Sequence, residues 1–132
     1  MNIKFVEKPW GFEEIWAHTQ NYVGKILTIN PGNKLSLQYH EKKEETIRVL
    51  GGTLFLHHKE NDSDNLSVSQ LTEGCVFHVS PRTVHRFEAR EEKVILVEVS
   101  TSEITDVVRL EDDFGRKGRS SRQENGQKGR QA

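Results

Sequence analysis

Short apolar segments that alternate with polar residues recur along most of the chain. In KLSLQYH, residues 34–40, two leucines and a tyrosine alternate with serine, glutamine and histidine. A period of two places successive side chains on opposite faces of a β-strand. Comparable strands are expected at 23–29, 46–50, 53–58, 66–71, 75–79, 85–89 and 94–100.

Turn residues separate these segments, and helical patterns are rare. Asn30-Pro31-Gly32 and Gly51-Gly52 are strong turn signals. No amphipathic stretch of ten or more residues precedes the C-terminal end, and residues 101–115 are expected to carry one short turn. Many short strands at this spacing predict an all-β antiparallel sandwich or barrel. A length of 132 residues suits a single domain.

Charge divides the chain into an acidic body and a basic tail. The net charge is -1, yet residues 115–132 hold six lysines and arginines against one glutamate. We therefore expect a folded domain over residues 1–114 and a basic, polar tail over residues 115–132. An acidic body argues against a nucleic-acid-binding domain, and for the tail we expect a role in solubility or none.

Cysteine use and apolar runs bear on the compartment. Cys75 is the one cysteine of the sequence, so the chain cannot form an internal disulfide, which fits a reducing cytosol. No stretch approaches the ~20 apolar residues of a membrane span. The first residues, MNIKFVEKPWGF, lack the apolar centre of a secretory signal. We expect a cytoplasmic protein without a membrane partner.

Four residues carry metal-binding chemistry: Gln38, His40, Glu45 and His85. Gln38 and His40 are two apart on one strand, so their side chains share a face. Glu45 follows after a loop that can return it beside His40, and His85 begins another strand. Two imidazoles, a carboxylate and an amide oxygen suit Zn²⁺ or another first-row divalent ion. Spacing alone also fits ordinary polar residues on the outside of a sheet, so that alternative stays open here.

The spacing resembles that of the cupins, which are small double-stranded β-helix barrels similar to jelly rolls. Their first motif has a glycine, five residues, a ligand, one residue, a histidine, four residues, a glutamate, six residues and a glycine. In this chain the matching residues are Gly32, Gln38, His40, Glu45 and Gly52. The second motif resembles Gly74 and the segment SPRTVH, which ends at His85, with Arg82 where glycine is usual.

Within the cupins, the chain is similar to the phosphomannose isomerase module of the type II enzymes. The segments KPWGFEEIW, PGNKLSLQYH, GTLFL, TVHRFEA and DVVRLEDDFGR carry this resemblance, from about Lys8 to Arg116. In that family the glutamine of the Gln-x-His pair is a zinc ligand. The resemblance implies a zinc-dependent mannose-6-phosphate isomerase, a homodimer, and a place in nucleotide-sugar and polysaccharide precursor synthesis. We expect no counterpart of the guanylyltransferase domain found in the bifunctional relatives.

The chain departs from the family pattern where phosphate is expected to bind. After its ligand histidine the module has a run rich in histidine and arginine, whereas this chain has EKKEETI. Lys43 stands at an arginine position, keeping the charge but not the bidentate fork that arginine offers a phosphate. The phosphate contacts implied are Lys34, Lys43 and Arg86, with Arg116 as a further candidate.

The catalytic base is left open. Glu44, His57 and His78 are candidates, and each is also explained as a structural residue. A non-catalytic or regulatory cupin that binds a sugar phosphate or related carbohydrate is the alternative function. A different metal-dependent cupin enzyme, such as an epimerase or a dioxygenase, is a third.

Overall fold

The computed structural model describes residues 2–59, 65–116 and 118–119. These parts of the chain form twelve β-strands and contain no helix, which confirms the all-β prediction. The strands are β1 (Lys4–Lys8), β2 (Gly11–His18), β3 (Val23–Ile29), β4 (Leu37–Tyr39), β5 (Glu45–Gly51), β6 (Leu54–Lys59), β7 (Leu66–Leu71), β8 (Val76–Val79), β9 (His85–Glu88), β10 (Val94–Ser100), β11 (Val108–Glu111) and β12 (Gly118–Arg119).

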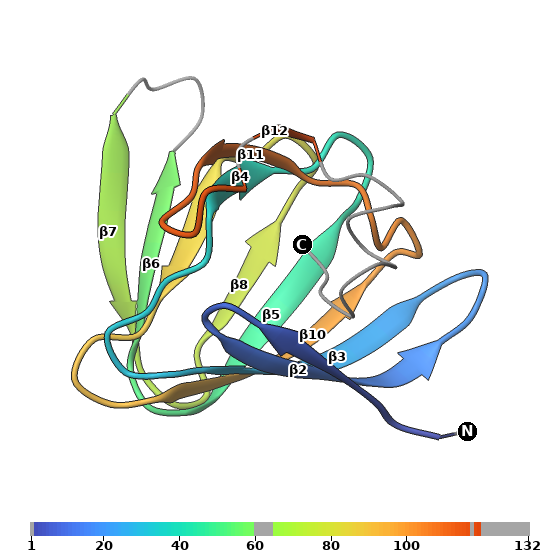
Figure 1. Cartoon of the computed structure of the whole chain (residues 1–132), viewed down its shortest axis with the longest axis horizontal. Helices are drawn as coiled ribbons and strands as arrows, with labels where there is room; N and C mark the ends of the chain where they lie inside the picture. Colours follow the sequence, from blue (N-terminus) through green and yellow to red (C-terminus); the bar gives the residue numbers. More distant parts are fainter. Residues whose placement is uncertain (1, 60–64, 117, 120–132) are drawn as a thin grey trace.

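The strands form two six-stranded antiparallel sheets that face each other (Figure 1). One sheet has the order β1-β2-β3-β10-β5-β8 and the other the order β12-β11-β4-β9-β6-β7. Strands distant in sequence are neighbours in both sheets, as β3 with β10 and β4 with β11. Within the described residues no helical segment has the length and apolar character needed to cross a bilayer.

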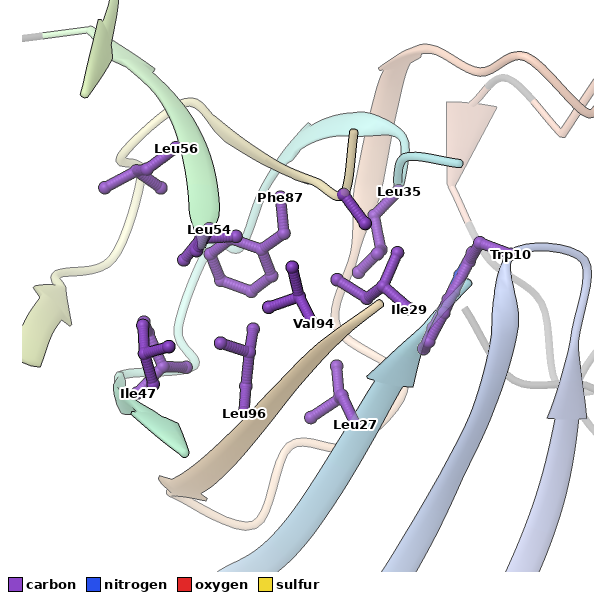
Figure 2. Packing of buried hydrophobic residues seen from close by; sticks show 12 residues of the cluster. Trp10, Leu27, Ile29, Leu35, Ile47, Leu54, Leu56, Phe87, Val94 and Leu96 are labelled. Atoms are coloured by element: carbon purple, nitrogen blue, oxygen red, sulfur yellow. The ribbon is translucent and has the colours of Figure 1, made fainter. Parts of the chain in front are cut away.

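The core lies between the two sheets because the apolar residues that alternate along the strands point inward. On β10, Val94 and Leu96 are buried, and Ile95 between them is only partly buried. Leu54 and Leu56 of β6 and Phe87 of β9 face them from the other sheet, as Figure 2 shows. Burial of this apolar layer is the main source of the barrel's stability.

The paired glycine after β5 has a steric requirement at its second member. Gly52 has φ +76°, a backbone conformation that other residues rarely adopt. A Cβ on Gly52 would also overlap the carbonyl oxygen of Lys93 in the neighbouring connection. Gly52 is thus required by the close approach of two backbones at this turn.

Four strands, β1, β2, β11 and β12, were not expected from the sequence. β1 and β2 carry buried charges at inward positions, Lys8 and Glu13, which hide the apolar alternation. β11 lies inside segment 101–115, where one short turn was expected, and it is short and rich in charge. The tail predicted for residues 115–132 contains the two residues of β12, which pair with β11. Residues 117 and 120–132 lie outside the described residues, so the domain boundary stays a prediction.

Candidate metal centre

Neighbouring strand ends bring three of the four predicted ligands together. His40 directly follows β4, Glu45 begins β5, and His85 begins β9. All three side chains are buried inside the barrel, His85 completely. Their ligand atoms lie within 4.8 Å of one another, so the cluster could hold one metal ion.

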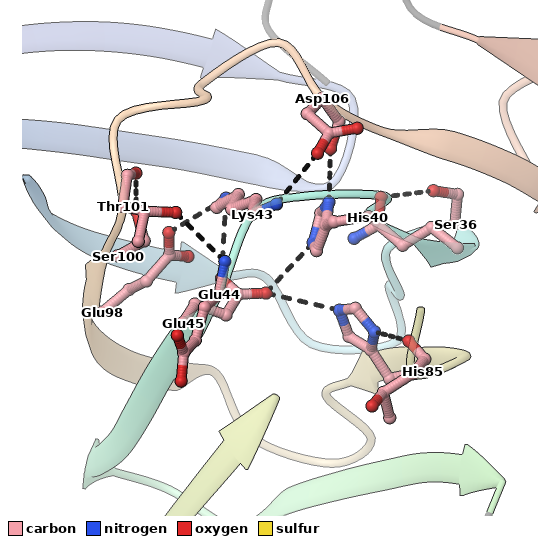
Figure 3. A network of polar contacts seen from close by, with 12 residues as sticks. Ser36, His40, Lys43, Glu44, Glu45, His85, Glu98, Ser100, Thr101 and Asp106 are labelled. Carbon is pink, nitrogen blue, oxygen red and sulfur yellow. Dashed lines mark hydrogen bonds and ion pairs between the residues drawn. The ribbon is translucent and has the colours of Figure 1, made fainter. Parts of the chain in front are cut away.

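Both imidazoles converge on one oxygen of Glu45 (Figure 3). The Nε2 atom of His40 lies 3.2 Å from Glu45 Oε1, and the Nε2 atom of His85 lies 3.4 Å from the same oxygen. The ring centroids are 5.3 Å apart and the ring planes are tilted by 53°. The rings therefore meet the carboxylate from two directions and leave space between their nitrogens.

The hydrogen bond made by Nδ1 of each ring determines whether its Nε2 atom donates or accepts. Nδ1 of His40 lies 2.6 Å from the carbonyl oxygen of Asp106, and Nδ1 of His85 lies 2.8 Å from that of Thr83. A carbonyl oxygen only accepts, so each Nδ1 donates and carries the proton. In the neutral imidazole each Nε2 then presents a lone pair to Glu45 Oε1, which is also an acceptor.

Three acceptors facing one another in a buried site favour a bound cation. Burial lowers the pKa of His40, although Glu45 would favour the protonated ring. The lowered pKa disfavours a doubly protonated His40 as an alternative partner of Glu45. Nε2 of His85 is buried and has no hydrogen-bond partner among the described residues. Two neutral imidazoles and a carboxylate are ligands for a first-row divalent ion. The donor set therefore fits a metal better than an ordinary histidine–glutamate ion pair.

Gln38 reaches the same cavity from β4. It is buried and lines the cavity beside His40 and Glu45. Its Oε1 accepts a hydrogen bond from the Ser36 hydroxyl over 3.2 Å. Gln38 is thus on the correct face for a fourth ligand, and its role as one stays a prediction.

Two buried charges adjoin the cluster on the side of Glu45. The ammonium of Lys43 lies 3.6 Å from Glu45 Oε2 and 3.2 Å from Glu98 Oε2. Burial would lower the pKa of Lys43, but the two carboxylates outweigh it and raise that pKa above its usual value. Burial, and then repulsion by Glu45, raise the pKa of Glu98 to about 7. Lys43 therefore stays charged and compensates the carboxylates.

The cavity that these side chains line is small and highly charged. Its volume is about 20 Å³, room for about one water molecule. Glu13 and Lys25, which pair at 3.2 Å, line it together with Glu98. Ile104 and Val107, from the connection between β10 and β11, line it as well. A larger ligand would require these side chains to move.

The predicted phosphate contacts do not form one cluster. Lys43 lines the cavity, whereas Lys34 and Arg86 do not. Lys34 Nζ lies 3.9 Å from Asp113, and Arg86 lies 3.5 Å from it, so these two cations share a carboxylate. Arg116 pairs with Asp112. The phosphate role of these residues stays a prediction.

The three candidate bases lie away from the cavity. The exposed pair Glu44 and His78 are 3.0 Å apart on the outer face. His57 lies 2.7 Å from Glu88, and none of the three candidates lines the cavity. Three titratable residues that do line it, Glu13, Lys25 and Glu98, were missed. A signal existed for Glu98, which is the lone charge at an inward position of an apolar strand.

A backbone feature explains one departure from the family pattern. Arg82, where glycine is usual, has φ +69°, a conformation that favours glycine. Its N–H donates to the carbonyl oxygen of His40 over 2.6 Å. The unusual residue therefore keeps the turn geometry, which holds the segment before His85 against the segment after β4.

The two sheets and the buried His-Glu-His cluster define a cupin. The chain belongs to the family described as "Mannose-6-phosphate isomerase C-terminal", whose model matches residues 2–112. This confirms the resemblance seen in the sequence.

Relatives and solved structures agree with this placement. The chain is 30% identical over 115 residues to "Xanthan biosynthesis protein XanB" of Xanthomonas campestris, covering 84% of this chain and 23% of that protein. It is 26% identical over 114 residues to "Mannose-1-phosphate guanylyltransferase RfbM" of Salmonella typhimurium, covering 83% and 22%. The chain thus spans less than a quarter of the length of these relatives. A Klebsiella pneumoniae protein with a double-stranded β-helix domain superposes with a TM-score of 0.64 at 20% identity, over 76% of this chain and 84% of that one.

Proposed function

We propose that the chain is a metal-dependent aldose–ketose isomerase that interconverts mannose 6-phosphate and fructose 6-phosphate. The observation that carries this proposal is the convergence of His40, Glu45 and His85 inside a barrel of the isomerase family. The names of the relatives, a xanthan biosynthesis protein and a mannose-1-phosphate guanylyltransferase, support a place in nucleotide-sugar and polysaccharide precursor synthesis.

The metal we propose is Zn²⁺, held by His40, Glu45 and His85 with Gln38 as the fourth ligand. Nitrogen and oxygen donors in this number are typical of a zinc site. When bound, a divalent ion would stabilise the negative charge that develops on a substrate oxygen as a proton moves between C1 and C2.

The chain's own residues would exclude water and balance charge. Leu27, Phe87 and Val107 form apolar parts of the cavity wall, and a site shielded from water strengthens electrostatic interactions. Lys43 holds the Glu45 carboxylate in place through its ion pair. For the phosphate we retain Lys34, Lys43 and Arg86. The phosphate would compete with Asp113 for Lys34 and Arg86.

We also propose a homodimer located in the cytoplasm. Support for the dimer comes from the outer face of the sheet that contains β1, β2 and β10. Phe5, Trp16 and Val99 are 66%, 41% and 51% exposed there. Exposed apolar side chains gathered on one face are typical of a protein–protein contact. Light scattering of the wild type and of Trp16→Glu would test it, with loss of the dimer in the variant as the expected result.

The isomerase proposal is tested by turnover. Purified protein is stripped of metal, reloaded with Zn²⁺ and assayed for fructose 6-phosphate formed from mannose 6-phosphate. Activity is expected for the zinc-loaded wild type and not for the stripped protein or for His85→Ala. If zinc-loaded protein binds the sugar phosphate without converting it, the proposed isomerase activity is wrong.

That result would favour the second candidate, a cupin that binds a sugar phosphate without turnover. The small cavity and the pairing of Lys43 with two carboxylates are the observations in its favour. Calorimetry with mannose 6-phosphate, run beside the assay, separates the two functions.

A further inference from the structure

One residue outside the ligand set contacts the loop that joins two proposed ligands. Residues 41–44 connect His40 with Glu45, and the connection between β10 and β11 passes beside them (Figure 3). The carboxylate of Asp106, in that connection, accepts hydrogen bonds from three successive backbone N–H groups. Their donors are Glu41 at 3.1 Å, Lys42 at 2.7 Å and Lys43 at 2.9 Å.

The backbone of Asp106 contacts a ligand directly. Its carbonyl oxygen accepts a hydrogen bond from Nδ1 of His40 over 2.6 Å. Asp106 therefore holds the His40 ring by its main chain and the following loop by its side chain. A histidine that donates from one nitrogen offers the other to a metal, and such partners orient the ring.

A second contact secures the other end of the same loop. The Glu44 N–H donates to the Thr101 hydroxyl over 3.1 Å, and the Thr101 N–H donates to the Glu44 carbonyl over 3.0 Å. Between these contacts, Ile104 packs against an apolar cluster that includes Val6 and Val23. The connection is thus anchored to the loop through both Thr101 and Asp106.

The Asp106 carboxylate is suited to this role. Burial would raise its pKa, but hydrogen bonds from the backbone of Lys42, Lys43 and Glu41 lower it below its usual value. The group is therefore ionised at neutral pH, and hydrogen bonds to an ionised acceptor are stronger than those between neutral groups.

We propose that Asp106 is a positioning residue of the metal centre. It keeps the proton of His40 on Nδ1 and sets the separation of His40 and Glu45 by holding the loop between them. This inference rests on the proposed metal centre, but its effect on the His40 ring exists without metal. A role limited to stabilising the loop would change the free energy of unfolding and leave the ring's tautomer unchanged.

The test uses three variants and two measurements. Asp106→Ala removes the carboxylate, and Asp106→Asn keeps one oxygen that can accept from Lys42 and Lys43. Thr19→Ala is the matched control, because Thr19 accepts from the backbone N–H groups of Asn21 and Tyr22 in a turn between β2 and β3. Zinc affinity is measured by competition with a chelator, and the His40 tautomer by ring ¹⁵N NMR of metal-free protein.

We expect Asp106→Ala to weaken zinc binding by roughly 10–100-fold, the usual effect of losing a group that orients the ligands of a metal. The Asp106 carbonyl remains in this variant, but without the carboxylate nothing ties it to residues 41–43. The carbonyl should then move away from Nδ1 of His40, so that the ring loses its preference for the Nδ1–H form. Asp106→Asn should be intermediate in both measurements, and Thr19→Ala should match the wild type.

Two results would overturn the proposal. One is an unchanged zinc affinity and an unchanged His40 tautomer in Asp106→Asn, the variant closest in shape to the wild type. The other is an equal loss of zinc affinity in Thr19→Ala. If the wild type binds no zinc, the proposed function fails. The inference about Asp106 is then decided by the ¹⁵N spectra of the metal-free proteins alone.

Discussion

Gln38 of β4 lies directly opposite His85 of β9 in the ladder that joins these two strands. Opposite residues of an antiparallel pair point to the same face of the sheet. The amide and the imidazole therefore enter the barrel side by side, although they come from distant parts of the sequence. Because His40 is two residues beyond Gln38, it also lies on this face, where Glu45 of the other sheet meets it.

The first prediction concerns loss of the metal ligands. His40→Ala and His85→Ala should each lose bound zinc, because few donors remain to compensate for a missing imidazole. Gln38→Ala should cost less affinity, since a neutral amide oxygen is the weakest donor of the set. Metal content after dialysis measures the loss, and circular dichroism should show the barrel retained, since its stability rests on the apolar layer.

His57→Ala is the matched control for these variants. His57 is also a histidine of a β-strand with a carboxylate partner, Glu88, but it does not line the cavity. The His57→Ala variant should therefore keep its zinc. Equal zinc content in His57→Ala, His40→Ala and His85→Ala would contradict the assignment.

The second prediction concerns the buried charges beside the cluster. Lys43→Met leaves Glu45 and Glu98 buried without their shared cation, and breaking a buried pair costs roughly 3–5 kcal/mol of folding free energy. Adding Glu98→Gln removes one of the two repelling carboxylates and should restore part of that loss. Urea unfolding of the metal-free proteins at pH 9, above the pKa of about 7 that Glu98 has beside Lys43, measures both effects. A double variant no more stable than Lys43→Met would show that Glu98 is not charged beside Glu45.

Much of the barrel was predictable from local pattern. β3, β7 and β10 match the strands expected at 23–29, 66–71 and 94–100. Alternation predicts such strands because one phase must be apolar to reach the core. Prediction from alternation missed β1 and β2, where Lys8 and Glu13 occupy inward positions. Buried charges at core positions are energetically costly, so a pattern based on apolarity alone treats them as exposed.

The proposed ligands could be named from the sequence and their surroundings could not. His40, Glu45 and His85 match the spacing of the two cupin motifs, so the family resemblance marks them as candidates. Asp106 contacts His40 across 66 positions through a backbone carbonyl. Any residue type can make a main-chain contact, so the sequence does not predict this one. Only the tertiary arrangement shows it.

The third prediction concerns Arg82. Its φ of +69° strains a residue with a Cβ by roughly 1–2 kcal/mol, and glycine adopts it without strain. Arg82→Gly should therefore be more stable than Arg82→Ala, which removes the same side chain but keeps the Cβ. Thermal unfolding compares the two variants. Equal stability would show that the turn relaxes once the arginine is gone.

The last prediction is a pH dependence caused by Lys8. Its side chain is fully buried, 3.9 Å from Glu13. Burial lowers its pKa from 10.5 to about 6, against the opposing effect of Glu13. Between pH 6 and 10.5 the unfolded chain therefore binds a proton that the native protein lacks. Unfolding takes up that proton, so the free energy of unfolding should rise with pH by up to about 1.4 kcal/mol per unit from this group.

Lys8→Met should abolish this contribution and, because it buries no amine, be more stable than the wild type near pH 7. Urea unfolding at pH 7, 8 and 9 gives the difference between the two proteins, which should shrink as the pH rises. Lys4→Met, at an exposed position of the same strand, controls for the loss of one positive charge. A difference between wild type and Lys8→Met that stays constant with pH would mean that Lys8 keeps its proton in the native barrel, held by Glu13.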